Sequence, residues 1–228
     1  MREVCYKCFR PLSSCYCKYV KKVDCGVKFI FLMHPKEAKK QKTGTGRLAH
    51  LCLPESEIFV GIDFTNNKQL NDLLQNPKYY PVLMYPSDNA VNASSESLAV
   101  ELKDKILMPI IIDSTWFCSR KILKTSKNLM PLPRFSFMNQ YKSVFTFKTE
   151  PKEYCVSTIE TCYYLINELK KQKLVNINCD TKPLMSVFTK MIEFQLKKEN
   201  ERIESGLPGV HAYDSKYTKL KEIPKFEF

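Results

Sequence analysis

Short apolar runs alternate with amphipathic segments over the first half of the chain. The runs are rich in β-branched and aromatic residues and predict four strands, at 27–33, 57–63, 80–85 and 106–113. The segments between and after them have helical spacing and predict helices at 36–42, 47–53, 67–75, 95–103 and 116–126. This alternation is typical of an α/β fold with a mainly parallel sheet and flanking helices on both faces.

The second half of the chain follows a different pattern. It predicts an extended, proline-broken segment at 130–137, a fifth strand at 143–148, and amphipathic helices starting at Ser157 and spanning about 183–200. Residues 205–228 combine glycine, proline and aromatics, and we expect them to form an irregular tail that packs on the body.

Polar residues follow three of the predicted strands at the points where they end. These are His34-Pro35, Tyr85-Pro86-Ser87, and Asp113-Ser114-Thr115 followed by Trp116, the only tryptophan. Ligands of open α/β sheets bind beyond the carboxyl ends of the strands. The sequence therefore predicts one crevice into which all three segments point.

Positive charge suggests a polyanionic partner. The chain has 36 Lys and Arg against 24 Asp and Glu, a formal charge of +12, which favours nucleic acid unless it reflects only a Lys-rich proteome. The most apolar early run, 27–33, is far shorter than the roughly 20 residues that span a bilayer. We therefore expect no membrane association and a cytosolic location.

Four cysteines at the start of the chain have metal-ligand spacing. Cys5, Cys8, Cys15 and Cys17 form C-x2-C-x6-C-x-C, which suits a tetrahedral thiolate zinc site of structural type. A loose reduced tail and an iron–sulfur cluster are the alternatives. We expect residues 1–24 to form a zinc knuckle and residues 25–228 one larger catalytic domain. Cys25 lies outside this spacing, and the other five cysteines lie in apolar patterns typical of a core.

The order of motifs identifies a family resemblance. The motifs are CYKC and CYC, HPKE at 34–37, TGRL at 45–48, YPS at 85–87, DSTW at 113–116, LPRF at 132–135 and STIE at 157–160. From Cys5 to about Leu169 the chain resembles the DTW-domain family of tRNA-uridine aminocarboxypropyltransferases.

The resemblance implies a fold and a reaction. The fold is an S-adenosylmethionine-binding one related to the SPOUT methyltransferases, with a knotted C-terminal region. The reaction is transfer of the 3-amino-3-carboxypropyl group of S-adenosylmethionine to N3 of a tRNA uridine, which releases methylthioadenosine. A SPOUT-type RNA methyltransferase and a zinc-dependent RNA-binding protein without catalysis are the alternatives. A sister family modifies ribosomal RNA, and the N-terminal cysteines speak against it.

Asp113 is the predicted catalytic residue. A partly desolvated carboxylate at a strand end is a reasonable base for the N3 proton. It could instead hold the amino group or ribose of the cofactor, or cap the following helix. Trp116 could form a wall for the adenine or face the sulfonium, although a lone tryptophan is ordinarily a core residue.

The remaining predicted cofactor-binding residues come from three motifs. Ser157 and Glu160 form a capping box, and the helix that they open could also take an anion. The LPR segment resembles loops that offer backbone groups to the adenine, with Arg134 as an anion ligand. The cofactor set is Tyr85, Pro86, Ser87, Asp113, Ser114, Thr115, Trp116, Leu132, Pro133, Arg134, Ser157, Thr158 and Glu160.

Basic residues near the crevice are the predicted RNA contacts. A run of charged residues is ordinarily a solvated face, but clustered Lys and Arg side chains can also track phosphates. The basic groups at 18–22 and 36–42 flank the knuckle and the crevice, which favours contact with RNA. His34 could equally be a histidine at a strand end whose ring nitrogens form hydrogen bonds within the protein. The predicted set is His34, Lys36, Arg47, Arg120, Lys121 and Lys124. No feature indicates an obligate protein partner, and the oligomeric state stays open.

Overall fold

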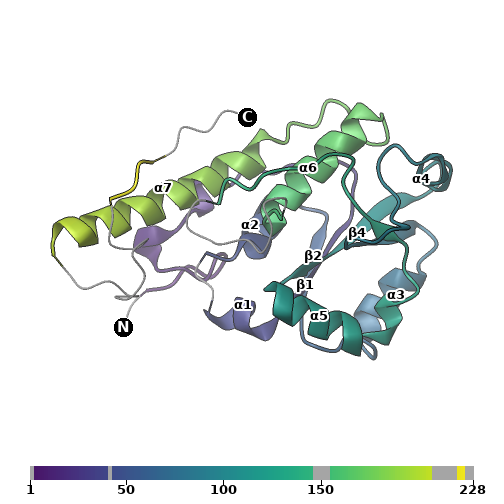
Figure 1. Cartoon of the computed structure of the whole chain (residues 1–228), viewed down its shortest axis with the longest axis horizontal. Coiled ribbons are helices and arrows are strands. Elements are labelled where there is room, and N and C mark those ends of the chain that lie inside the picture. Colours follow the sequence, from purple (N-terminus) through teal and green to yellow (C-terminus); the bar gives the residue numbers. More distant parts are fainter. Residues whose placement is uncertain (1–2, 41–42, 146–154, 207–219, 224–228) are drawn as a thin grey trace.

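A computed structural model describes residues 3–40, 43–145, 155–206 and 220–223 of the chain. A parallel sheet lies between two layers of helices (Figure 1). Its strands are β1 (Phe29–Met33), β2 (Ser56–Val60), β3 (Tyr79–Met84), β4 (Ile106–Asp113) and β5 (Arg134–Phe135). The predicted α/β class, with helices on both faces of a parallel sheet, is confirmed.

The helices fall close to the predicted segments. They are α1 (Pro35–Lys40), α2 (Thr45–Cys52), α3 (Lys68–Gln75), α4 (Glu96–Glu101), α5 (Trp116–Thr125), α6 (Thr158–Lys171) and α7 (Lys182–Glu204). Shorter 3-10 turns lie at Leu12–Ser14, Cys17–Tyr19 and Lys127–Leu129. None of the described helices is both long and apolar enough to cross a membrane, and the cytosolic location stays a prediction.

The strand order places β4 at the centre of the sheet. The order is β2-β1-β4-β3-β5, and every neighbouring pair runs parallel. Met33 at the end of β1 therefore lies in register with Asp113 at the end of β4. All carboxyl ends meet at one edge, as the predicted crevice requires.

Strand alternation divides the core into two layers. In β1, Phe29 and Phe31 pack with buried residues of α2, α6 and α7, whereas Ile30 and Leu32 pack with α3 and α5 on the opposite face (Figure 1). Side chains two residues apart in a strand share a face. Asp113, two residues after Ile111, therefore faces the layer of α2 and α6.

The predicted strand at 143–148 is wrong for the part that the structure describes. Ser143 and Val144 are not in a strand, because the Val144 N–H donates to the Glu160 carboxylate at 2.7 Å instead of to a neighbouring strand. Residues 146–148 lie outside the described residues.

The knot and the division of the chain at residue 24 stay predictions. Tyr16, which lies in the predicted knuckle, belongs to the same hydrophobic core as α6 and α7.

Part of the predicted C-terminal tail contacts the body. Lys221 exchanges two hydrogen bonds with the Asn200 side chain of α7, at 2.9 and 2.7 Å. The described residues of this segment, 205–206 and 220–223, lie outside helices and strands. The prediction that the tail packs on the body is confirmed for Lys221, and most of the tail lies outside the described residues.

Two buried carboxylates of α6 hold the segment between β5 and residue 145. Glu168 accepts from the N–H groups of Met138 and Asn139, and from the Tyr141 hydroxyl at 2.9 Å. Burial, with the nearby Glu168 charge, raises the pKa of Tyr141 to about 12. Tyr141 therefore stays a donor at neutral pH.

We predict that Glu168→Ala destabilises the fold by about 3 kcal/mol or more, because several donors to a buried charge lose their acceptor. Urea unfolding followed by circular dichroism measures this loss. Glu193→Ala is the control, since it removes only an i,i+3 pair with Lys190 at the surface and should cost below about 1 kcal/mol. Equal losses in the two variants would contradict the anchoring role of Glu168.

Candidate active site and metal centre

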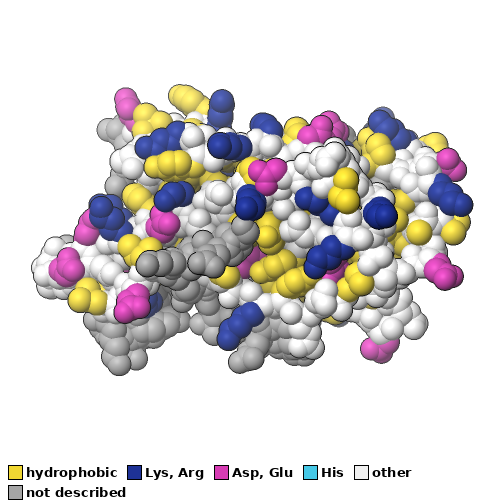
Figure 2. Space-filling model, turned by 90° about the horizontal axis from the view of Figure 1, so that it is seen from above, with side chains coloured by type: hydrophobic (Ala, Val, Ile, Leu, Met, Phe, Trp, Pro, Cys, Tyr) yellow, Lys and Arg dark blue, Asp and Glu magenta, His cyan; other side chains and the backbone are white. Residues whose placement is uncertain are grey.

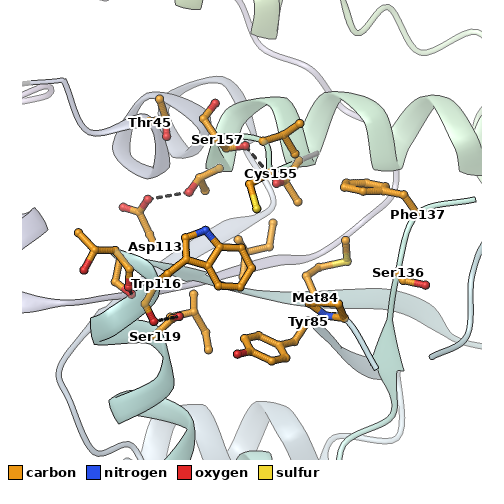
Figure 3. A pocket seen from close by; sticks show the side chains of 18 of the residues that line it. Thr45, Met84, Tyr85, Asp113, Trp116, Ser119, Ser136, Phe137, Cys155 and Ser157 are labelled. Atoms are coloured by element: carbon orange, nitrogen blue, oxygen red, sulfur yellow. Dashed lines mark hydrogen bonds between the residues drawn. The ribbon is translucent and has the colours of Figure 1, made fainter. Parts of the chain in front are cut away.

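A cavity of about 680 Å³ opens at the carboxyl ends of β3 and β4. Segments from across the chain form its wall, and the lining is mostly apolar (Figure 3). The lining residues are Glu37, Thr45, Met84–Pro86, 111–117, Ser119, Phe135–Phe137, Asn139, Gln140, 155–158 and Thr161. The predicted crevice therefore exists at the ends of β3 and β4, and it is large enough for a nucleoside-sized ligand. The prediction that His34-Pro35 also points into it is wrong, because neither residue lines the cavity.

Asp113 lies in this wall and is 5% exposed. Its Oδ1 accepts a 2.7 Å hydrogen bond from the Thr158 hydroxyl at the start of α6 (Figure 3). On the other side, α2 approaches so closely that a Cβ at Gly46 would lie 2.3 Å from Oδ2. The carboxylate is thus held between two helices rather than extended into open solvent.

Three helices begin at the cavity wall. Thr45 opens α2, Thr115 caps α5, and Ser157 caps α6 in the predicted capping box. The first N–H groups of a helix lack intrahelical acceptors and carry partial positive charge. The cavity is therefore suited to a ligand with a carboxylate or a developing anion.

Aromatic side chains line the cavity from two sides. Trp116 lies 6.1 Å from Tyr85 between ring centroids and is 37% exposed, so it is not a core residue. Phe137 lies across the pocket from Asp113 (Figure 3). Phe117, next to Trp116, lines the cavity and is 77% exposed. Flat rings at these places can stack on a base or face a cation.

Eight of the predicted cofactor residues line the cavity and five do not. Tyr85, Pro86, Asp113–Trp116, Ser157 and Thr158 form part of the wall. Ser87 lies one residue beyond it in an exposed turn, where its carbonyl accepts from Ala90. Glu160 is fully buried, and it accepts from Ser143, Val144 and Ser157. The Glu160 carboxylate therefore holds residues 143–144 in place by hydrogen bonds rather than lining the cavity.

The LPR segment lies behind the wall rather than in it. The Pro133 carbonyl accepts from the Leu83 N–H at 2.9 Å, so it belongs to the sheet. Leu132 packs on the core of α3 and α5, and the Arg134 guanidinium lies 5.7 Å from the Tyr85 ring centroid. The lining begins one residue later, at Phe135.

Several lining residues have no motif in the sequence that marks them. Cys155 is buried, and Phe137, Asn139 and Gln140 reach the cavity through the segment that Glu168 anchors. Contacts of that segment with α6, and a hydrogen bond from the Ser136 N–H to the Val91 carbonyl at 2.9 Å, hold it there. Its aromatic and amide composition was the one signal that could have suggested a ligand wall.

The predicted RNA contacts are divided between surface and interior. Arg120, Lys121 and Lys124 are exposed on α5, and Lys36 is exposed on α1. His34 is 6% exposed and its Nδ1 accepts from the Lys36 N–H, which fits a structural role better than an RNA contact. Figure 2 shows the face of α6 and α7, where Lys and Arg side chains are spread among acidic ones.

The four N-terminal cysteines come together as predicted. Their sulfur atoms all lie within 4.8 Å of one another, with Cys5–Cys17 and Cys8–Cys15 each at 3.7 Å. N–H donors of Cys8 and Lys7 lower the pKa of Cys5 to about 6, so that this thiol is ionised at neutral pH. The group could hold a metal ion, and four soft sulfur ligands fit zinc.

We predict that Cys8→Ser removes most of the bound zinc, because a tetrahedral site then lacks one thiolate. Metal analysis of the purified protein measures the zinc content, which should be near one ion per chain in the unaltered protein. Cys118→Ser, outside the cluster, is the control and should keep its zinc. A ratio near one in Cys8→Ser would contradict the four-cysteine site.

We predict that Gly46→Ala destabilises the fold by about 1–3 kcal/mol, although alanine is the better helix former, because the added methyl overlaps the Asp113 carboxylate. Urea unfolding measures the change. In an Asp113→Ala background the same substitution should cost nothing or stabilise α2. An equal cost in both backgrounds would show that the carboxylate is not what excludes the side chain.

Comparison with known proteins agrees with the motifs. The chain is 29% identical to tRNA-uridine aminocarboxypropyltransferase 2 of Drosophila melanogaster over 170 residues, 70% of this chain and 64% of the fly protein. The match thus covers less than two thirds of that relative's length. No solved structure matches. The DTW domain model matches residues 2–196, and the chain therefore belongs to the DTW domain family.

Proposed function

We propose that the protein transfers the 3-amino-3-carboxypropyl group of S-adenosylmethionine to N3 of a uridine in tRNA and releases methylthioadenosine. The observation that carries this proposal is the buried Asp113 in the wall of a cavity at which three helices begin. Membership of the DTW family and the name of the fly relative support the choice of reaction.

The cavity wall fits the chemistry of S-adenosylmethionine. The helix N-termini at Thr45 and Ser157 are suited to the amino-acid carboxylate. The Tyr85 and Trp116 rings are suited to the adenine or the sulfonium. The cavity of about 680 Å³ leaves room for a nucleobase beside the cofactor.

The reaction requires one displacement and one proton transfer. N3 of the uridine forms a bond to the carbon next to the sulfonium, and the carbon–sulfur bond breaks with its electron pair left on sulfur. The N3 proton passes to a base, for which Asp113 is our candidate. The Thr158 hydroxyl and α2 hold that carboxylate in one orientation, which lowers the cost of positioning.

The α5 surface is suited to the RNA substrate. Arg120, Lys121 and Lys124 extend from the mouth of the cavity along the exposed side of α5, and Phe117 lies at the mouth itself. Cations along such a path neutralise phosphates, and an exposed ring can stack on an unpaired base. The net charge of +12 agrees with a polyanionic substrate.

We assign zinc a structural role in this protein. Four thiolates fill a tetrahedral site and leave no position open for a reacting water. Cys5, Cys8, Cys15 and Cys17 would hold the ion. Residues 3–20 have little core of their own, so the metal would stabilise their fold.

We predict that Asp113→Ala lowers turnover more than tenfold without loss of the fold. Mass spectrometry of nucleosides from tRNA incubated with protein and S-adenosylmethionine measures the modified uridine, and methylthioadenosine release measures turnover. Asp88→Ala, an exposed carboxylate beyond β3, is the control and should keep its activity. More than a tenth of the original activity in Asp113→Ala would remove Asp113 from catalysis.

The by-product separates the reaction from its alternatives. Release of S-adenosylhomocysteine with a methylated base would identify a methyltransferase. Absence of both by-products, with no heat of S-adenosylmethionine binding in calorimetry, would identify an RNA-binding protein without catalysis. The proposed transfer requires methylthioadenosine and the aminocarboxypropyl nucleoside in equal amounts.

A further inference from the structure

A second, much smaller cavity joins the cysteine cluster to the active site. Its wall contains Cys8 and Arg10 from the knuckle, Arg47 from α2, and Asp113. Glu37 of α1 borders both this cavity and the larger one. A metal ligand and the proposed catalytic carboxylate thus line the same small cavity, and we call the side chains of its wall the layer.

Phe9 is held on this layer by the turn that carries the first two cysteines. Its N–H donates to the Cys5 carbonyl at 2.8 Å, and its φ of +57° lies in the left-handed region, which an aromatic residue rarely adopts. The ring is 61% exposed, so burial in a core does not explain its conformation. The turn that draws Cys5 and Cys8 together also fixes where the ring points.

The Phe9 ring packs on the guanidinium of Arg47. The guanidinium carbon lies 4.4 Å from the ring centroid, within the range of a cation–π contact. Arg47 also donates to the Ala38 carbonyl at 3.4 Å. These two contacts, from the knuckle and from α1, fix a long side chain that would otherwise sample many rotamers.

Arg47 lines the smaller cavity together with the Asp113 carboxylate and the Cys8 thiol. Burial lowers the pKa of Arg47, and the nearby Asp113 carboxylate acts in the opposite direction. The position of the guanidinium therefore affects the electrostatic environment of the proposed base. Loss of the turn that contains Cys5 and Cys8 would remove the Phe9 ring from Arg47. The Arg47 side chain could then leave the layer.

We propose that Phe9 is a positioning residue that links the knuckle to the active site by holding Arg47 beside Asp113. The link to turnover rests on the proposed function, whereas the positioning itself does not. Arg47 thereby has a role in the site besides the RNA contact predicted from the sequence. The knuckle, completed by its metal, becomes part of the active site rather than a separate RNA-binding appendage.

The test uses Phe9→Leu, which keeps an apolar side chain but removes the ring, and Phe9→Tyr, which keeps the ring. Tyr6→Leu is the matched control, because Tyr6 is an aromatic residue of the same turn and is 94% exposed. Zinc content and melting temperature are measured for each variant. Both should match the unaltered protein in all three.

Two readouts then follow Arg47 and the pocket without requiring turnover. Peptide mass spectrometry measures the rate at which phenylglyoxal modifies Arg47. Fluorescence of Trp116, the only tryptophan in the chain, measures the affinity for S-adenosylmethionine. In Phe9→Leu we expect Arg47 to react severalfold faster and the affinity to fall severalfold, in keeping with the loss of a cation–π contact. Phe9→Tyr and Tyr6→Leu should behave like the unaltered protein.

Kinetics provide the third readout. Phe9→Leu should lower kcat about fivefold to tenfold, with KM for tRNA within about twofold, because the lost contact faces Asp113 rather than the RNA. Arg47→Met should give a similar loss, and the double variant should lose no more than the worse single one. If Phe9→Leu loses its zinc, the inference is tested with Arg47→Met instead, since this substitution leaves the knuckle sequence intact.

The outcomes separate this inference from the proposed function. Unchanged Arg47 reactivity and unchanged affinity in zinc-loaded Phe9→Leu would overturn the inference. After zinc loss in that variant, unchanged affinity and kcat in Arg47→Met would overturn it as well. Additive losses in the double variant would also contradict it. Faster Arg47 modification without transferase activity in any variant would support the positioning role and reject the proposed reaction.

Discussion

The confinement of one carboxylate, that of Asp113, is the constraint on which the site depends. Strand alternation points its side chain towards α2 and α6, where Thr158 donates to it and Gly46 makes room for it. A buried carboxylate without such partners would cost several kcal/mol. The close approach of α2, the start of α6 and the central place of β4 are therefore parts of one arrangement.

Opposite this carboxylate, a segment without regular structure forms the far wall of the cavity. Residues 136–145 have few backbone partners of their own, and Glu160 and Glu168 of α6 supply the missing acceptors. The two glutamates are eight residues apart, so they lie on the same side of the helix. One face of α6 thus serves the core, the capping of its own first turn, and the wall of the pocket.

The sequence predicted the sheet and the central part of the site because both depend on local patterns. Asp113 and Trp116 follow an apolar strand, and the carboxyl ends of parallel strands must meet. The LPR prediction misses the wall by one residue, because the lining begins at Phe135, directly after the predicted segment. Glu160 was recognised as a capping residue, but the sequence could not reveal that it also accepts from Val144. The contact between Gly46 and Asp113 is tertiary and has no local signal.

The cavity wall combines segments that lie far apart along the chain, from Glu37 to Thr161. During synthesis on the ribosome, the pocket cannot form until α6 has left the exit tunnel and packed on the sheet. A nascent or truncated chain that ends before Ser157 lacks the partner of Asp113 and one of the three helix N-termini. A ligand of this pocket, such as the S-adenosylmethionine that we propose, would therefore bind only the completed fold. Its concentration in the cell would then shift the balance between folded chains and those open to proteolysis.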